Sequence, residues 1–159
     1  HTPSGSVSAA LGGRLISMGP VNDLGTEELK ARALPEVVAG RKGSSLAITE
    51  PSGGSDVAAL RTRARKDGNH WVIDGEKTFI TGGMKADWCV VAARTGGAGV
   101  SGVSLFLVEA DREGFSRASV GEKTGWWCSD TATLRFDGVR AGTVILDEIG
   151  LRSVRNRVP

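Results

Sequence analysis

Apolar side chains follow two different spacings along this chain, and the change comes near Ser44. Before it, apolar residues recur at the three- or four-residue spacing of a helix with one apolar face, at Val7, Leu11, Leu15 and Met18. After it, apolar residues form short runs or alternate with polar ones, which is typical of strands. The pattern predicts a helical segment over residues 1–43, a β-domain over 44–148 and an irregular tail over 149–159.

Capping residues and prolines mark where the helices begin and end. Thr2 can cap a first helix that has Pro3 at its first position, and we expect Gly19-Pro20 to end that helix. Thr26 precedes two glutamates and predicts a second helix start, because a hydroxyl cap and acidic residues both suit the N-terminal end. Pro35 should begin a new short turn, since a proline inside a helix removes a hydrogen bond.

Strand-length segments separated by turn residues fill the second part of the chain. Asp67-Gly68, Asp74-Gly75 and Asp137-Gly138 are each expected to form a tight turn. Because no helical crossover separates the strands, a parallel α/β sheet is disfavoured. The fold class predicted is mainly β, an antiparallel sandwich or barrel preceded by short helices. The expected strands are 46–49, 61–65, 70–73, 77–81, 88–93, 103–108, 115–120, 131–136 and 144–146.

Composition narrows the class of protein without identifying it. The chain has 20 basic and 18 acidic residues, a net charge of +2, so a nucleic-acid partner is not expected. The basic run at Arg61, Arg63, Arg65 and Lys66 is interpreted as a solvated strand face. No apolar run reaches the roughly 20 residues of a membrane helix. We expect a cytoplasmic protein with no membrane partner.

Cysteine and histidine usage gives no sign of a metal site. Cys89 and Cys128 are interpreted as reduced thiols, because nothing in their spacing indicates a disulfide. The sequence has no CxxC or HExxH motif, so no metal is expected. His70 is expected to be exposed beside a turn.

The stretch from Leu46 to Gly83 has the features of a ligand-binding surface. The turn Ser52-Gly53-Gly54-Ser55 could bring several backbone N–H groups onto an anion such as a pyrophosphate, although on this feature alone an ordinary loop is the preferred interpretation. Thr49 and Thr81 each end a strand, where a hydroxyl could bond the edge of a heteroaromatic ring. Taken alone, ordinary β-propensity is the preferred explanation of both threonines.

Aromatic residues add a second set of candidates. Phe79 is two residues before Thr81 and is expected on the same strand face, where it could stack on a flat ring. From the residue and its spacing alone, a core position for Phe79 is the preferred interpretation. Trp126 and Trp127 are adjacent, so on a strand they would face opposite sides. We expect one of them to fill the core and the other to face a partner.

The sequence shows no catalytic constellation. The carboxylates at Glu50, Asp56, Glu76 and Glu122 have no evident partner or apolar setting that would shift their pKa values. Glu50 precedes Pro51 and is expected only to cap or brace the turn that follows.

Several motifs, in order, resemble those of the acyl-CoA dehydrogenase family. The resemblance covers about residues 44–148, and residues 1–43 look like the end of the family's N-terminal helical domain. The matching motifs are Ala47-Ile48-Thr49-Glu50-Pro51, Gly54-Ser55-Asp56-Val57, Ile73-Asp74-Gly75-Glu76-Lys77, Ile80-Thr81, Ala86-Asp87-Trp88, Ser129-Asp130-Thr131 and Phe136-Asp137-Gly138-Val139-Arg140.

The resemblance implies a middle β-domain that binds FAD and acyl-CoA between two helical domains. In the family, a glutamate removes the α-proton of an acyl-CoA thioester and flavin N5 takes the β-hydride. By resemblance, Thr49 would bond the ring edge, Ser55 would reach the pyrophosphate and the acyl-CoA, Phe79 would stack on the ring, and Thr81 would lie near N5. The residues implied to bind the cofactor are Leu46, Ile48, Thr49, Gly54, Ser55, Phe79, Ile80 and Thr81.

The resemblance also implies partners and leaves two functions open. Electron-transfer flavoprotein would accept electrons from the complete enzyme, and a homo-oligomer is expected. The family's base lies in a C-terminal helical region with no counterpart in this sequence, so no catalytic residue is assigned; Trp127 stands where many members carry Arg. One hypothesis is the FAD- and acyl-CoA-binding part of an acyl-CoA dehydrogenase, as a fragment or a truncated paralogue. The alternative is a non-catalytic β-domain that has lost FAD and acts only in binding or assembly.

Overall fold

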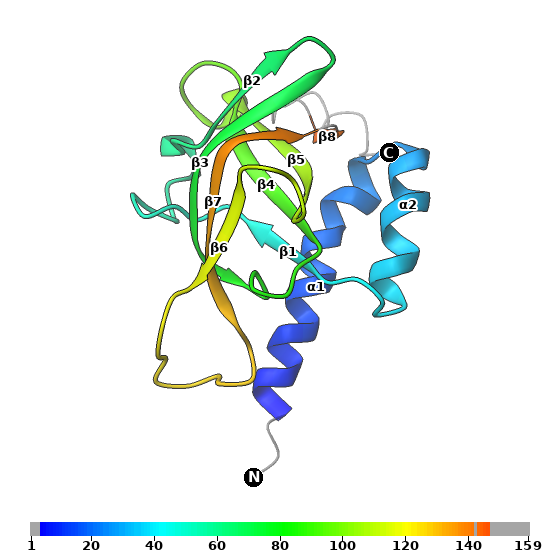
Figure 1. Ribbon diagram of the computed structural model, residues 1–159, viewed down its shortest axis with the longest axis vertical. Coiled ribbons are helices and arrows are strands. Elements are labelled where there is room, and N and C mark those ends of the chain that lie inside the picture. Colours follow the sequence, from blue (N-terminus) through cyan, green and yellow to red (C-terminus); the bar gives the residue numbers. More distant parts are fainter. Residues whose placement is uncertain (1–3, 142, 147–159) are drawn as a thin grey trace, which may run out of the picture.

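A computed structural model of the protein describes residues 4–141 and 143–146. Two helices come first and eight strands follow in one sheet (Figure 1). The α-helices are α1 (Ser4–Leu24) and α2 (Glu27–Val38), and two 3-10 turns lie at η1 (Val57–Ala59) and η2 (Val100–Gly102). The strands are β1 (Ser44–Ala47), β2 (Arg63–Asp67), β3 (His70–Thr81), β4 (Trp88–Arg94), β5 (Val103–Glu109), β6 (Phe115–Ser119), β7 (Thr131–Ala141) and β8 (Thr143–Leu146).

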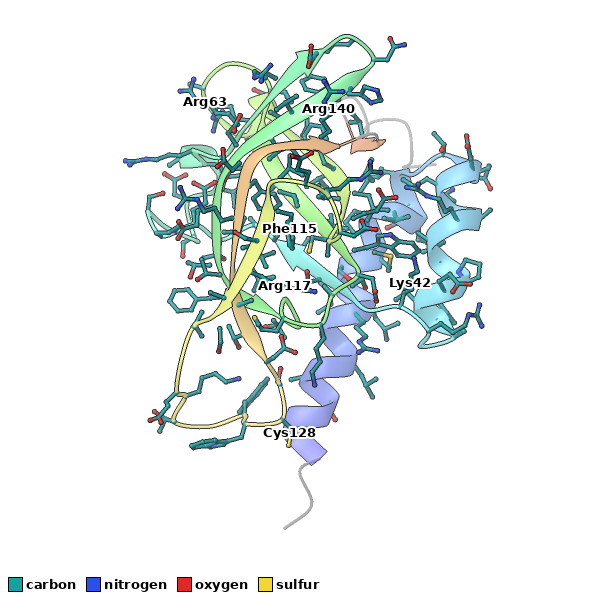
Figure 2. The ribbon with its side chains drawn as sticks, in the orientation of Figure 1. Lys42, Arg63, Phe115, Arg117, Cys128 and Arg140 are labelled. Carbon is teal, nitrogen blue, oxygen red and sulfur yellow. The ribbon has the colours of Figure 1, made fainter. Side chains whose placement is uncertain are left out.

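The predicted fold class is confirmed, because the strands form a mostly antiparallel sheet preceded by helices. The strand order is β6-β7-β3-β2-β4-β5-β8, and β1 pairs with β4 outside this path. The parallel pairs are β1 with β4 and, over a single residue pair, β2 with β4. Arg117 on the edge strand β6 donates to the Ala86 carbonyl at 2.9 Å and so ties that edge to the loop before β4 (Figure 2).

Strand β4 is buried on both faces, which explains its continuous apolar run. Its alternate residues Cys89, Val91 and Ala93 face a core between β-strands that also holds Phe106. The other face, beginning at Trp88, meets apolar residues of α1 and α2. A strand covered on both faces is expected to be apolar throughout. Among the described residues, no helix is long and apolar enough to cross a membrane.

Both helices continue through prolines that were expected to end them. Pro20 lies inside α1 and Pro35 inside α2, so both predictions of a break are wrong. Buried apolar residues flank each proline, and their packing outweighs the loss of one helical hydrogen bond. The cap at Thr26 is confirmed, since its hydroxyl accepts from Leu29 N at 3.2 Å. The cap expected at Thr2 and the tail expected over 149–159 lie outside the described residues.

Helix α1 buries only part of the apolar stripe expected. Leu11 is 56% exposed and Leu15 66% exposed, so these two residues of the predicted stripe do not face the core. Met18, the last residue of the stripe, is buried as expected, together with Ser17 and Val21. Ser17 donates a hydrogen bond of 2.7 Å to the hydroxyl of Ser44 at the start of β1. A buried polar contact to the sheet, which sequence periodicity does not reveal, therefore selects this face.

Only one of the three expected Asp-Gly turns forms. Asp67-Gly68 connects β2 to β3 as predicted. Asp74-Gly75 and Asp137-Gly138 instead lie inside β3 and β7, opposite each other at a shift in register, so those two predictions are wrong. Gly138 has φ +65 and its N–H donates to the Asp74 carboxylate at 2.7 Å. Asp74-Gly75 and Asp137-Gly138 therefore form a β-bulge, in which one strand carries an extra residue. Glycine suits this position because it adopts the left-handed conformation without strain.

A second bulge turns Phe79 away from the core. The register between β3 and β7 shifts between Lys77 and Ile80, and Phe79 has φ +58. Lys77, Thr78 and Ile80 are buried, while Phe79 and Thr81 are exposed. The insertion of one residue breaks the strict alternation of the strand. As a result, Phe79 and Thr81 lie on the outer face, whereas unbroken alternation from the buried Lys77 would have placed both inside.

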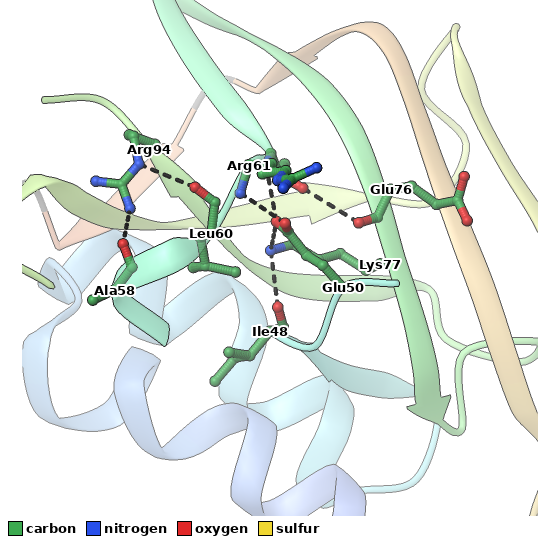
Figure 3. A network of polar contacts seen from close by, with 9 residues as sticks. Ile48, Glu50, Ala58, Leu60, Arg61, Glu76, Lys77 and Arg94 are labelled. Carbon is green, nitrogen blue, oxygen red and sulfur yellow. Dashed lines mark hydrogen bonds and ion pairs between the residues drawn. The ribbon is translucent and has the colours of Figure 1, made fainter. Parts of the chain in front are cut away.

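A buried ion pair fixes the segment after β1 to the middle of β3. The Lys77 side chain is fully buried, and its Nζ lies 2.9 Å from Oε1 of Glu50, whose side chain is 3% exposed (Figure 3). Lys77 Nζ also donates to the Ile48 carbonyl at 2.9 Å. Glu50 accepts from the backbone N–H groups of Arg61 at 2.7 Å and Thr62 at 2.8 Å. The prediction that Glu50 lacks a partner is therefore wrong. Its partner, Lys77, lies far along the chain, so the residues around Glu50 contain no sign of the pairing.

Gly75 should tolerate no side chain. A Cβ there would lie 2.6 Å from Thr62 Oγ1 and 2.7 Å from Thr62 Cα, with φ at +146. Gly75→Ala is expected to lower the free energy of unfolding by about 2 kcal/mol or more. Urea denaturation measures this. The matched control is Gly97→Ala, where no atom lies within 4 Å of the new Cβ. Equal effects at the two sites would contradict the close approach of Thr62.

The stability of the fold should fall in acid because of Glu50. Burial alone would raise its pKa, but hydrogen bonds from Lys77, Thr62 and Arg61 outweigh burial and lower the pKa of Glu50 to about 2. A carboxylate with a lowered folded-state pKa stabilises the fold above its unfolded pKa and loses that contribution as the pH falls towards 2. The loss should be about 3 kcal/mol.

Urea denaturation between neutral pH and pH 2 tests this dependence. Glu50→Gln should flatten the acid limb of the stability profile, whereas Glu122→Gln, at an exposed site, should leave it unchanged. An unchanged acid limb in Glu50→Gln would show that other carboxylates cause the loss.

Candidate functional site

A cavity of about 270 Å³ lies where α1, the end of β1 and the end of β3 meet. Most of the residues predicted to bind the cofactor line it, although they come from two separate segments of the sequence. We call it the Thr49–Phe79 pocket. Its lining residues are Gly13, Ile16, Leu46, Ile48, Thr49, Phe79, Ile80 and Thr81.

Two threonine hydroxyls in this pocket are available to a ligand. Among the described residues, neither Thr49 Oγ1 nor Thr81 Oγ1 has a hydrogen-bond partner. Thr49 follows β1 and Thr81 ends β3, so the two hydroxyls come from the two walls of the pocket. A hydroxyl can both donate and accept, which suits a ring edge that carries both kinds of group.

Phe79 supplies an aromatic face beside the threonines. Its side chain is 67% exposed, so the core position preferred from the residue and its spacing alone is wrong. A bulky residue with a positive φ is strained by roughly 1–2 kcal/mol. Such strain persists only where the surrounding structure fixes it, and it is concentrated at binding and catalytic sites. The bulge of β3 therefore presents an aromatic ring at the pocket at a cost in stability.

The helix α1 closes one side of the pocket. A Cβ at Gly13 would lie 3.4 Å from Cγ2 of Thr81, which shows how closely the helix backbone approaches the end of β3. Ile16, one turn further on, also lines the pocket and is 65% exposed. Neither Gly13 nor Ile16 was expected at a site, because their spacing in a helix carries no signal of ligand binding.

Gly54 and Ser55 lie next to this pocket without lining it. A Cβ at Gly54 would be 3.1 Å from Cγ2 of Thr49, so the glycine packs directly against that threonine. Both residues belong to an exposed turn. The turn is closed at its base by paired backbone hydrogen bonds of 3.1 Å and 3.0 Å between Glu50 and Gly53. The structure thus carries the Gly-rich turn at the edge of the pocket, adjacent to Thr49.

A turn after β3 fixes the position of Thr81 from the other side. Asp130 accepts from Met84 N through its carboxylate at 2.8 Å, and from Gly82 N through its carbonyl at 3.0 Å. Asp130 belongs to the Ser129-Asp130-Thr131 motif, and Thr131 pairs with Thr81. The motif therefore supports the wall of the pocket without contacting its interior.

A second cavity, of about 730 Å³, is lined in part by residues that follow the Gly-rich turn in the sequence. Arg63, Arg65 and Arg94 line it together with Ala58 and Asp74. The Arg94 guanidinium donates to the carbonyls of Ala58 at 2.6 Å and Leu60 at 3.0 Å (Figure 3). Arg63 and Arg65 remain exposed.

The positive lining of this cavity was not identified from the sequence. The only sign in the sequence that Arg94 lines a site is its position directly after the apolar run 88–93. The cavity lies at the end of the molecule opposite the loop that carries Cys128 (Figure 2).

The tryptophan loop does not match its prediction. Trp126 is 64% exposed and Trp127 75% exposed, so neither fills the core. The residues lie in a loop between β6 and β7, where strand alternation does not apply. Lys123 orders this loop, since its Nζ donates to the carbonyls of Trp126 and Ser129.

The remaining titratable groups give little chemistry. His70 is exposed, as expected, and Cys89 and Cys128 are free thiols. Burial raises the pKa of the Cys89 thiol to about 11, so it is unreactive at neutral pH. Within residues 4–141 and 143–146, no three His, Cys, Asp or Glu side chains are grouped as metal ligands.

Comparison with known proteins identifies the family. Residues 45–139 match the acyl-CoA dehydrogenase middle domain. The chain is 43% identical over 132 residues to acyl-CoA dehydrogenase AFT10-1 of Alternaria alternata, covering 82% of this chain and 30% of that protein. The chain therefore spans about 30% of the length of this curated relative.

Solved structures give the same result. A probable acyl-CoA dehydrogenase from Mycobacterium abscessus superimposes with a TM-score of 0.88 at 40% identity, over 96% of this chain and 42% of that one. A glutaryl-CoA dehydrogenase from Mycobacterium smegmatis in complex with FADH2 superimposes with a TM-score of 0.77 at 36% identity, over 86% of this chain and 35% of that one. The chain therefore belongs to the acyl-CoA dehydrogenase family, with the family's middle domain over residues 45–139.

Proposed function

We propose that this chain forms the FAD- and acyl-CoA-binding wall of an enzyme that oxidises the α–β bond of an acyl-CoA thioester. The observation that carries the proposal is the Thr49–Phe79 pocket, where two free hydroxyls and an exposed aromatic ring converge from separate strands. The glutaryl-CoA dehydrogenase that this chain resembles binds FADH2, which supports a flavin as the ligand.

Each lining residue has a role that fits a flat, partly polar ring. Thr49 and Thr81 would bond the ring edge through their hydroxyls, and Phe79 would stack on its face. Leu46, Ile48 and Ile80 supply apolar surface that excludes water from the ring. When bound, FAD supplies the acceptor for the hydride that leaves the β-carbon.

The phosphate-bearing parts of both ligands have suitable surroundings on this chain. Gly54 and Ser55 would meet the FAD pyrophosphate through the exposed turn beside Thr49, and Ser55 would also reach the acyl-CoA. The cavity that follows the turn carries Arg63 and Arg65, which are exposed and positively charged. Guanidinium groups favour phosphate, so this cavity is suited to the nucleotide end of coenzyme A.

Further proposals concern the complete enzyme. The α-proton of the acyl-CoA would be removed by a carboxylate outside the Thr49–Phe79 pocket. Electron-transfer flavoprotein would accept the electrons, and a homo-oligomer would cover the apolar side chains that this chain exposes, such as Leu11 and Leu15. A cytoplasmic location remains a proposal from the sequence.

Flavin titration tests the proposed ligand directly. The purified 159-residue chain should quench the fluorescence of added FAD in a saturable way. Thr49→Val/Thr81→Val keeps the shape of the pocket and removes both hydroxyls, so it should weaken binding by about tenfold. A chain that never binds FAD would overturn the proposal and favour a non-catalytic role in binding or assembly. Anaerobic addition of acyl-CoA should cause no bleaching, because the base is supplied elsewhere.

Substitutions at Phe79 separate binding from stability. At φ +58, glycine is unstrained and alanine is not, so Phe79→Gly should be more stable than Phe79→Ala by about 1 kcal/mol, the reverse of the usual order in a strand. Both variants lose the stacking face and should bind FAD about tenfold more weakly, since aromatic stacking contributes on that scale. Thermal denaturation and flavin titration measure the two effects.

The control for Phe79 is Val100→Ala, at an exposed apolar residue outside the pocket. It should change neither quantity. If Phe79→Ala and Phe79→Gly bound FAD as tightly as the original chain, the ring would have no role in the site.

A further inference from the structure

We infer that the buried Glu50–Lys77 pair is a positioning device, which sets the separation of the two walls of the Thr49–Phe79 pocket and anchors the Gly-rich turn beside it. The inference rests on the proposed flavin site for its functional consequence. Its structural part stands on the hydrogen bonds of residues 48–50, 61–62 and 77–78.

Three contacts join the two walls immediately behind the pocket. Lys77 Nζ donates to the Ile48 carbonyl and to the Glu50 carboxylate, both at 2.9 Å. Thr78 N donates to the Thr49 carbonyl at 2.9 Å. Ile48 and Thr49 belong to one wall, and residues 79–81 of the other wall follow directly after Lys77 and Thr78. A change at Lys77 therefore alters the spacing of groups that themselves line the pocket.

The bulge that exposes Phe79 depends on the same contacts. A regular strand would direct the N–H of a β3 residue towards a neighbouring strand, but Thr78 N bonds Thr49 outside the strand pairing. The Thr78 hydroxyl contacts the Thr133 hydroxyl at 3.1 Å on the opposite side. Held by Lys77 before it and by these bonds at Thr78, the backbone reaches the strained conformation of Phe79.

The Glu50 carboxylate extends this support to the phosphate end of the site. By accepting from Arg61 N and Thr62 N, it closes the loop that contains the Ser52–Ser55 turn. Glu50 itself pairs with Gly53 at the base of that turn. One buried charge pair thus fixes the ring walls and the turn relative to each other. Lys77 and Glu50 contact none of the space in the pocket, so they are positioning residues.

The test uses the full chain with three variants. Lys77→Met keeps most of the volume and removes the ammonium. Lys77→Met/Glu50→Gln also removes the unpaired carboxylate, so it should recover part of the stability lost in the single variant. Lys66→Met, at an exposed lysine on β2, is the matched control. The probes are FAD and riboflavin, which lacks the pyrophosphate, with affinity and the bound-flavin spectrum as readouts.

We expect the single and the double variant to bind FAD at least about tenfold more weakly, the scale on which supporting residues act around ligand sites. The spectrum of bound riboflavin should shift as well, because the ring walls move. Recovery of stability without recovery of affinity is the signature of positioning. If the double variant regained both, or if Lys77→Met bound FAD like the original chain, the inference would be overturned.

Amide hydrogen exchange of the flavin-free chain distinguishes this inference from the proposed function. In the double variant, exchange over residues 48–55 and 78–81 should accelerate relative to β4 and β5, which report the global stability. If the original chain binds no flavin and this local acceleration still occurs, the proposed ligand is wrong and the positioning role stands. Uniform exchange across all these segments would overturn the positioning role itself.

Discussion

The burial of one charge pair constrains most of this structure. Lys77 is fully buried and bonds Glu50 and Ile48, while Glu50 also receives two backbone N–H groups. Burial lowers the pKa of Lys77 to about 8 despite Glu50, whereas the hydrogen bonds on Glu50 lower its pKa to about 2. The lowered pKa of Lys77 opposes stability near neutral pH and the lowered pKa of Glu50 favours it, as expected of a buried ion pair whose attraction is offset by desolvation. Either charge left alone in the interior would be costly, so the pair keeps Glu50 and Lys77, and the segments that carry them, next to each other.

The two bulges between β3 and β7 shape the wall of the Thr49–Phe79 pocket next to the Glu50–Lys77 pair. At the first, Gly75 and Gly138 admit the close approach of Thr62 and the contact with Asp74. At the second, one inserted residue places Phe79 and Thr81 on the same outer face as the pocket. Bulges are common beside binding sites because they redirect a side chain without breaking the sheet. Here the backbone of Phe79 is strained, and the surrounding hydrogen bonds hold it in that conformation.

The motifs of this chain contain both residues that line the pocket and residues that support it from behind. Glu50, Lys77 and Asp130 are buried or bonded behind the pocket, whereas Thr49, Phe79 and Thr81 line it. Glu50 and Lys77 each lie within two residues of a lining residue in the sequence. Asp130 is next to Thr131, which pairs with Thr81. A short motif can therefore carry both the group that contacts a ligand and the group that holds it in place.

The sequence by itself determined the fold class, the approximate positions of most strands and part of the candidate site. The Asp67-Gly68 hairpin and the Thr26 cap followed from residue types and spacing, and ordered motifs placed Thr49, Phe79 and Thr81 in one site by resemblance. Strand lengths did not follow, since the segments 70–73 and 77–81 expected as two strands are one strand, β3. Only the tertiary structure decided the rest. Pro20 and Pro35 stay helical because packing outweighs one lost hydrogen bond, and Asp74-Gly75 forms a bulge because β7 lies opposite it. The partner of Glu50 is Lys77, far along the chain, and local propensity carries no information about which distant group will share a buried position.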